Sequence, residues 1–170
     1  ARPVYMVPTR NRYGIIGPIL PQTLSAEGVK AAIANNPMVK DGIDPTPVHA
    51  IITNSTYDGL TYNVTRVEEL LGQSVDRLHF DEAWYGYARF NPLYRDRHAM
   101  HGSPDDHDAS KPTVFATQST HKLLAALSQA SMIHVRNGRN PIEHGRFNES
   151  YMMHASTSPN YAIMASCDVS

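Results

Sequence analysis

Short apolar runs alternate with helix-compatible segments along the chain. The runs are rich in β-branched or aromatic residues, and each ends near polar residues, which is typical of buried strands. We therefore expect strands at 4–7, 48–52, 78–80, 114–116 and 132–135.

The segments between these runs carry helix signals. Ser25 can cap a helix that Pro37 stops. A capping-box pattern starts at Thr65 and opens a helix that ends at Gly72. Further helical segments are expected at 122–130, 146–153 and 161–165. Strands that alternate with helices predict an α/β fold with a mostly parallel sheet and flanking helices.

The polar stretch 95–111 contains several types of metal ligand. His98 and His101 are followed by acidic residues and a histidine at 105–108. The spacing matches no closed zinc site, and clusters of charge are usually surface features, so we expect a solvated loop and no metal. A metal-binding or purely structural domain is the alternative, and metal titration would separate the two.

Composition and charge narrow the class of protein. The 170 residues are 41% apolar and 18% charged, as in ordinary soluble globular proteins. A net charge of −1 gives no field to attract nucleic acid or an anionic membrane, and no apolar run approaches the roughly 20 residues that span a bilayer. The single cysteine, Cys167, and the lack of a signal peptide favour a cytoplasmic location. The chain lacks an initial methionine and both ends look cut, so we expect an internal piece of a longer protein.

The residues that follow the strands are the candidates for chemistry, because ligands of parallel α/β sheets bind beyond the carboxyl ends of the strands. Asp81 follows the third expected strand, and Ser119, His121 and Lys122 follow the fourth. Pyridoxal phosphate enzymes need a lysine for the aldehyde, a carboxylate for the pyridine nitrogen and hydroxyls for the phosphate. Asp81, Lys122 and Ser119 could supply these groups. Taken singly, Asp81 could instead be a helix cap and Lys122 a solvated lysine.

Longer motifs connect these residues with a known family. The chain resembles the prokaryotic ornithine/lysine/arginine decarboxylases of the aspartate-aminotransferase fold, and most of all the arginine-specific members. The resemblance covers essentially the whole chain and rests on the motifs at 8–17, 53–59, 79–84, 119–124, 128–131, 151–154 and 157–159. It implies that residues 1–170 are part of the large, cofactor-binding domain of a pyridoxal-phosphate-dependent protein.

The resemblance also implies roles for single residues at the ring. Lys122 would form the imine with the cofactor, and Asp81 would pair with the pyridinium nitrogen. Ala83 would pack against one face of the ring, with Trp84 beside it.

Three further residues would contact the cofactor at its periphery. Ser119 and His121 would bind the phosphate or orient the imine. Ser156 would reach the cofactor of a neighbouring subunit; the family usually has threonine there, and the serine keeps the hydroxyl. A homo-oligomer, a dimer or a decamer, is therefore implied.

The implied reaction is decarboxylation of a basic amino acid, with arginine converted to agmatine and carbon dioxide. Lysine or ornithine decarboxylation, transamination on the same fold, and an inactive structural unit are the alternatives. The resemblance places the phosphate loop, the histidine that stacks on the ring and the C-terminal domain outside this chain, so we expect the isolated chain to be inactive. Glu82 and the aromatic run 84–87 could bind a guanidinium group, or they could be a surface acid beside core packing.

Overall fold

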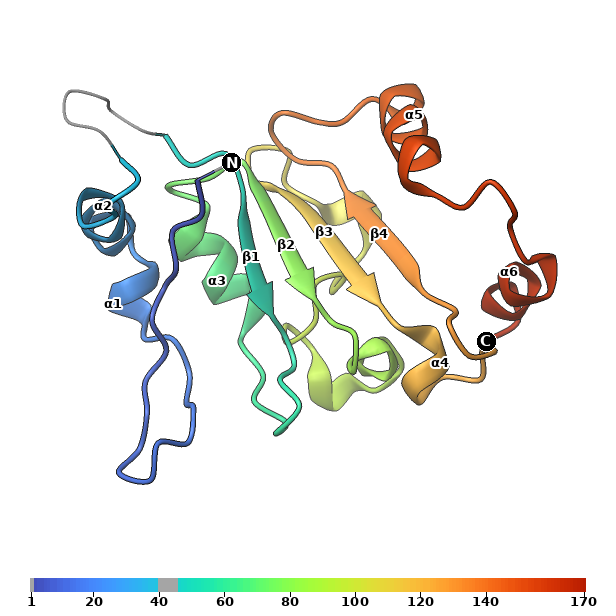
Figure 1. Cartoon of the computed structure of the whole chain (residues 1–170), viewed down its shortest axis with the longest axis horizontal. Helices are drawn as coiled ribbons and strands as arrows, with labels where there is room; N and C mark the ends of the chain where they lie inside the picture. Colours follow the sequence, from blue (N-terminus) through green and yellow to red (C-terminus); the bar gives the residue numbers. More distant parts are fainter. Residues whose placement is uncertain (1, 40–45) are drawn as a thin grey trace.

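The central element of the fold is a four-stranded sheet in the order β1-β2-β3-β4. The computed structural model describes residues 2–39 and 46–170. Its strands are β1 (Ala50–Thr53), β2 (Arg77–Asp81), β3 (Thr113–Gln118) and β4 (Met132–Arg136). The first three strands are parallel and β4 is antiparallel to β3, so the mostly parallel sheet is confirmed (Figure 1).

Short helices connect the strands and extend the fold at both ends. The α-helices are α1 (Pro21–Leu24), α2 (Ala26–Ala34), α3 (Val64–Leu71), α4 (Thr120–Leu123), α5 (His144–His154) and α6 (Tyr161–Asp168). Three 3₁₀-helices follow β2, namely η1 (Gly86–Phe90), η2 (Pro92–Tyr94) and η3 (Pro104–Asp106). Helices α5 and α6 lie beyond β4 and contain no buried residue in the described part of the chain (Figure 1).

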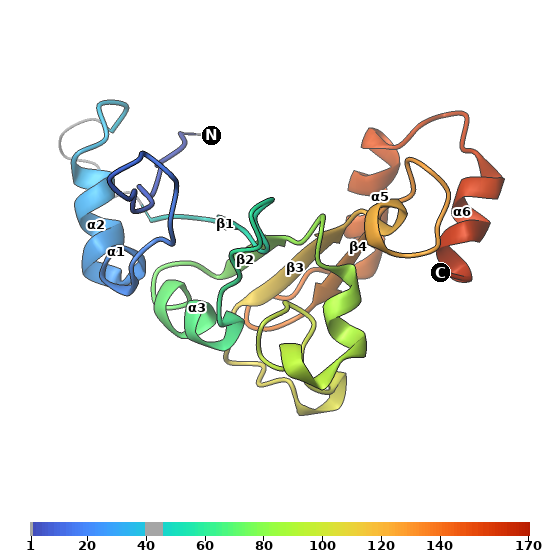
Figure 2. The same ribbon diagram turned by 90° about the horizontal axis from the view of Figure 1, so that it is seen from below.

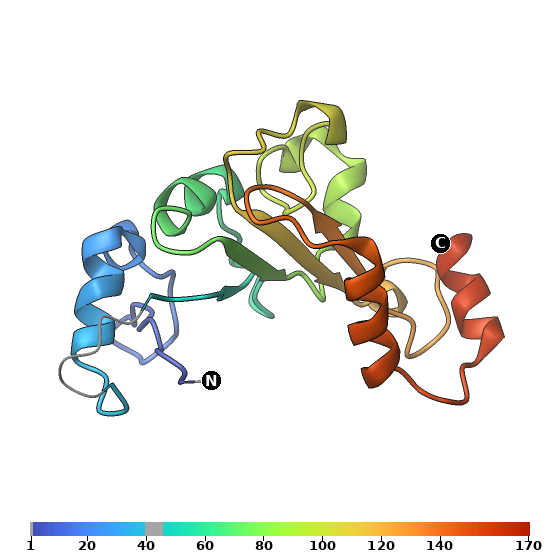
Figure 3. The same cartoon turned by 90° about the horizontal axis from the view of Figure 1, so that it is seen from above.

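The hydrophobic core lies on one face of the sheet. Alternate residues of β2 and β3 point into it, and among them Phe80 and Val114 have 0% exposure. Helix α3 covers this face with Val64, Val67 and Leu71. Figures 2 and 3 show α3 and the 3₁₀ segments on the same side of the sheet. The opposite face is more open, with Ile51 exposed to 63%.

The strand expected at 4–7 is wrong. This segment is extended, but it joins no sheet within the described residues; nearby, Arg10 and Ile16 form an isolated bridge. Met6 nevertheless packs against the core. The apolar pattern therefore reflected partial burial, and a strand also needs a neighbouring backbone to pair with.

The helix predictions are confirmed in part. The side chain of Ser25 accepts a hydrogen bond from Gly28 N at 3.2 Å, as an N-cap should. Helix α3 ends at Gly72 as expected, but its N-cap is Asn63 and not Thr65, because the Asn63 side chain accepts the Arg66 N–H at 2.9 Å.

The helix expected at 122–130 is wrong beyond Leu123. Helix α4 stops at Leu123, and Leu124 is already extended. The chain then turns back, and Ala130 is fixed by two contacts between its carbonyl oxygen and His121, one from the backbone N–H and one from the ring. The apolar residues of this segment therefore line a turn.

Candidate active site

The carboxyl ends of β2 and β3 form the edge at which the predicted site residues gather. The two strands are parallel, and Asp81 lies opposite Thr117 in the register. Asp81 is the last residue of β2, whereas Ser119 directly follows β3 and leads into α4, which carries Lys122. The fold therefore brings the two strand ends predicted to hold the cofactor to one edge of the sheet (Figure 1).

Lys122 and Trp84 are in direct contact across this edge. The Lys122 ammonium nitrogen lies 4.7 Å from the centre of the Trp84 ring, which is the distance of a cation–π contact. The indole in turn meets Tyr57, from the segment after β1, edge to face at 5.1 Å. The amine is thus held beside an aromatic ring at the end of the neighbouring strand.

The position of Asp81 is set mainly through its backbone. Its carbonyl oxygen accepts the Asn54 N–H at 2.7 Å. Its side chain is half-buried, and Oδ1 accepts the Ala83 N–H at 3.2 Å. A carboxylate can accept several hydrogen bonds, so this contact leaves capacity for a further donor.

His121 and Ser119 each offer a polar atom near the start of α4. The His121 Nδ1 lies 2.7 Å from the carbonyl oxygen of Ala130. A carbonyl only accepts, so Nδ1 carries a hydrogen and donates it, which leaves Nε2 as the second polar atom of the ring. Ser119 is the N-cap residue of α4, but its side chain makes no capping bond to the described helix.

Ser156 lies apart from the other predicted residues. It follows α5 and is exposed, and its hydroxyl accepts the Ser158 N–H at 3.0 Å. In Figure 1 the segment between α5 and α6 lies across β4 from β2. Within one chain, the structure therefore does not bring Ser156 to the edge where Asp81 and Lys122 lie.

His79, a polar residue near Asp81, was not among the site residues predicted from the sequence. His79 lies two residues before Asp81 in β2, so both side chains share a face of the sheet. Its Nε2 lies 2.6 Å from Thr117 Oγ1, and its ring stacks on His49 with 6.0 Å between the ring centres. Burial lowers the pKa of His79, while the charge of Asp81 acts in the opposite direction. Strand periodicity alone could have placed His79 and Asp81 on one face.

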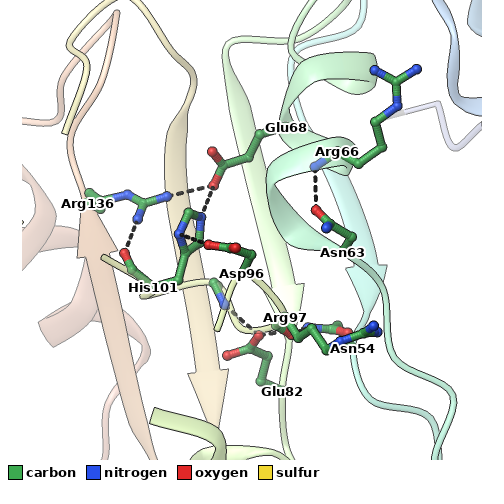
Figure 4. Close-up of polar contacts among 10 residues, drawn as sticks. Asn54, Asn63, Arg66, Glu68, Glu82, Asp96, Arg97, His101 and Arg136 are labelled. Carbon is green, nitrogen blue, oxygen red and sulfur yellow. Dashed lines mark hydrogen bonds and ion pairs between the residues drawn. The ribbon is translucent and has the colours of Figure 1, made fainter. Parts of the chain in front are cut away.

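Both predictions for Glu82, a surface acid or a ligand for a guanidinium group, are wrong, because its side chain is buried. It has 0% exposure. Its Oε1 accepts bonds from Asn54 Nδ2 at 2.9 Å and from Ala99 N at 2.7 Å (Figure 4). Its Oε2 accepts one from Gln118 Nε2 at 3.3 Å. Burial raises the pKa of Glu82 to about 7.

The aromatic run after Glu82 is largely packing. Tyr85 is 1% exposed, and its ring meets those of Tyr87 and Tyr94 edge to face. Trp84 is the member of the run that contacts Lys122. The packing reading of Tyr85 is therefore the one that the structure supports.

The expected solvated loop at 95–111 is partly wrong. His98 and Ala99 are buried, with 4% and 0% exposure, whereas residues 102–106 are exposed. Burial, with nearby positive charge, lowers the pKa of His98 to about 4. Nowhere in the described residues do three or more His, Cys, Asp or Glu side chains gather as a metal site would require.

One hollow in the described part of the chain lies away from the predicted cofactor residues. It has a volume of about 400 Å³, and Arg89, Arg95 and His98 are among its lining residues, whereas Asp81 and Lys122 are not.

The described part of the chain has no helix with the length and apolar character needed to cross a membrane.

Comparison with known proteins decides the family. The family profile described as "Orn/Lys/Arg decarboxylase, major domain" matches residues 1–170. The chain belongs to this family. The biodegradative arginine decarboxylase of Escherichia coli (strain K12) is 61% identical over 169 residues, which are 99% of this chain and 22% of that protein. Lysine decarboxylase LdcA of Pseudomonas aeruginosa is 51% identical over 170 residues, which are 99% of this chain and 22% of that protein.

A solved structure of the family agrees with this assignment. Lysine decarboxylase A from Pseudomonas aeruginosa superposes with a TM-score of 0.88 at 51% identity, over 98% of this chain and 22% of that one. The predicted fold class is confirmed. The chain spans about a fifth of the length of the relatives that it matches.

The residues present fit the chemistry of pyridoxal phosphate. A lysine amine beside an aromatic ring, a half-buried carboxylate with accepting capacity, and a serine and a histidine with available polar atoms all lie at the ends of two adjacent strands. This donor set matches the needs of the aldehyde, the ring nitrogen and the phosphate.

Proposed function

We propose that the complete protein containing this chain is a pyridoxal-phosphate-dependent decarboxylase of basic amino acids, and that residues 1–170 form part of its large domain. The observation that carries the proposal is the placement of Asp81 and Lys122 at the carboxyl edge of adjacent parallel strands. The family match along the whole chain supports it.

The bound cofactor would supply an electron sink for the electron pair left when the substrate carboxylate departs as carbon dioxide. Asp81 would hold the proton on the ring nitrogen through its negative charge. Lys122 would bind the cofactor through its amine. Ser119 and the free Nε2 of His121 would hold and orient polar groups of the cofactor, and Ala83 would contact the ring face beside Trp84.

We propose arginine as the preferred substrate. The greater identity to an arginine decarboxylase than to a lysine decarboxylase supports this choice. One proton is consumed as arginine gives agmatine and carbon dioxide. Because Glu82 is buried and fully engaged, the acceptors for the guanidinium would come from residues other than Glu82. Lysine or ornithine is the second candidate, supported by the other members of the family.

The complete protein would be a cytoplasmic homo-oligomer. Helices α5 and α6 carry exposed apolar side chains, among them Met153 at 79% and Tyr161 at 77%. Exposed apolar surface of this kind favours a protein partner. A second subunit on these helices would also give Ser156 a route to the neighbouring cofactor.

Product analysis tests the proposed function. Purified complete protein, loaded with pyridoxal phosphate, should release carbon dioxide and an amine from the substrate, whereas an aminotransferase would yield a keto acid. The ratio kcat/KM should be larger for arginine than for lysine or ornithine at mildly acidic pH. Preference for lysine or ornithine would overturn the substrate but keep the decarboxylase, and a keto acid product would overturn the reaction.

A further inference from the structure

Glu82 is a buried acid at the edge of the candidate site, directly after Asp81. Removing a carboxylate from water is costly unless donors compensate it. Glu82 has 0% exposure, and its side chain is ringed by hydrogen-bond donors. An apolar residue of similar size would fill the same space, but it could not accept these bonds. The carboxylate therefore serves to join the groups that donate to it.

The donors come from segments far apart in the sequence. Asn54 follows β1, Gln118 ends β3, and Ala99 belongs to the loop after η2. Glu82 itself follows β2. One side chain thus joins the carboxyl ends of three parallel strands and the loop that packs over them, as Figure 4 shows for Asn54 and the loop.

Asn54 extends the connection to Asp81. The Tyr62 N–H donates to Asn54 Oδ1 at 2.9 Å, so the amide nitrogen must point toward Glu82 Oε1 and the Arg97 carbonyl oxygen. The backbone N–H of Asn54 donates to the Asp81 carbonyl oxygen at 2.7 Å. Asn54 therefore holds two successive residues of the β2 end, Asp81 by its backbone and Glu82 by its side chain.

Gln118 extends the connection in the other direction. It donates to Glu82 Oε2 at 3.3 Å and directly precedes Ser119, which opens the helix that carries Lys122. The backbone agrees with this link, because the Glu82 N–H donates to the Thr117 carbonyl oxygen at 2.9 Å. Glu82 thus connects the strand end of Asp81 with that of Lys122 through both its backbone and its side chain.

We propose that Glu82 is a positioning residue of the cofactor site, whose carboxylate keeps the strand end that carries Asp81 in register with the strand end that leads to Lys122. The inference rests on the proposed pyridoxal phosphate function. A displacement of about 1 Å between groups that act on one ligand can cost a hundredfold in rate, so a fixed spacing between the two strand ends has consequences for the cofactor.

Four variants of the complete protein test the role. Glu82→Ala removes all three contacts, and Gln118→Ala removes only the one that leads toward Lys122. Glu82→Gln is the conservative variant, because its amide oxygen can still accept from Asn54 and Ala99 and the Gln118 amide can turn to accept the new N–H. Glu68→Ala is the matched control, since Glu68 is also a buried acid, at 3% exposure, but pairs with Arg136 on the core side of the sheet.

The measurements are the melting temperature of the apoprotein, the dissociation constant for pyridoxal phosphate, and the absorption spectrum of the bound cofactor. Glu82→Ala should weaken cofactor binding by about 10- to 100-fold, by analogy with the loss when a partner that orients a metal-binding residue is removed, and it should change the spectrum. Gln118→Ala should act in the same direction but less strongly. Glu82→Gln should restore binding close to the wild type. Glu68→Ala should lower the melting temperature without changing cofactor affinity or spectrum.

The outcomes separate three cases. If Glu82→Ala melts earlier but binds the cofactor with wild-type affinity and spectrum, Glu82 is only a folding residue and the inference is overturned. If Glu82→Ala does not fold, Gln118→Ala takes its place, and wild-type cofactor affinity and spectrum in that variant overturn the inference. If the wild-type complete protein binds no pyridoxal phosphate, the proposed function fails, and the positioning role fails with it.

Discussion

The ammonium group of Lys122 rests 4.7 Å from the centre of the Trp84 ring. Lys122 belongs to the segment after β3 and Trp84 to the segment after β2, so the contact joins the two strand ends that carry the candidate chemistry. The contact therefore places the amine at the edge of the sheet where the cofactor is proposed to bind.

Lys122 is expected to carry the cofactor in the complete protein. Borohydride reduction of the loaded enzyme, followed by peptide mapping, should place the pyridoxyl group on this residue. The reason is its place after β3, opposite the carboxylate that would hold the ring nitrogen. Lys30, in α2, and Lys111, in the loop before β3, are internal controls, and a label on either would contradict the assignment.

Replacement of Asp81 by asparagine should lower turnover by at least about a hundredfold while part of the cofactor stays bound. The neutral amide cannot stabilise the protonated ring nitrogen, so the electron sink weakens. Asp76→Asn is the matched control, because Asp76 lies at the opposite end of β2, where it pairs with Arg139 at 2.5 Å. Steady-state kinetics of both variants check the prediction. Wild-type turnover in Asp81→Asn would count decisively against the role.

Glu68 and Arg136 form a buried ion pair on the core side of the sheet, with 2.6 Å between Oε1 and Nη2 (Figure 4). The pair joins α3 to β4, and Arg136 also donates to the His101 carbonyl oxygen at 3.0 Å. Glu68→Ala leaves a buried guanidinium without its counter-charge, which should cost roughly 3–5 kcal/mol of the free energy of unfolding. Denaturant unfolding measures this loss of stability. The double variant Glu68→Leu with Arg136→Met should recover much of the lost free energy of unfolding, because it leaves no unpaired charge.

The strands could be predicted because their apolar pattern is local. The runs at 78–80 and 114–116 lie within β2 and β3, and Asp81 and Ser119 follow from where those strands end. The same pattern failed at 4–7, since nothing in a run of apolar residues states whether a neighbouring backbone is present to pair with it.

The environment of the site could not be predicted in this way. The burial of Glu82 depends on donors at positions 54, 99 and 118, and its neighbours in the sequence carry no sign of them. The early end of α4 has a similar cause, because the carbonyl oxygen of Ala130 is held by the His121 ring and the chain must turn to reach it. Local propensity describes neither contact.

His98 should destabilise the protein as the pH falls. Burial lowers its pKa to about 4 from an ordinary value of 6.5, so the unfolded chain takes up the proton first. The stability that the neutral ring contributes is complete above pH 6.5 and is lost as the pH falls through the folded pKa. His98→Gln removes this titration, so its melting temperature relative to wild type should rise between pH 7 and pH 4.5. A constant difference across that range would contradict the lowered pKa.

Glu82 should destabilise the protein as the pH rises, over much of the same pH range. Burial raises its pKa to about 7 from 4.5, so the folded protein holds the proton more tightly than the unfolded chain does. The contribution of the protonated acid is complete below pH 4.5 and is lost as the pH rises through 7, by roughly 3 kcal/mol for a shift of this size.

Glu82→Gln has no proton to lose, so its melting temperature relative to wild type should rise steadily between pH 4.5 and pH 8. The comparison cancels the titration of every other group, because both proteins share them. Asn54→Asp is a second test, because it replaces a donor to Glu82 Oε1 with a second acid. Repulsion between the two carboxylates should make the melting temperature fall more steeply above pH 7. A flat difference between wild type and Glu82→Gln over this range would show that Glu82 stays ionised in its cluster of donors.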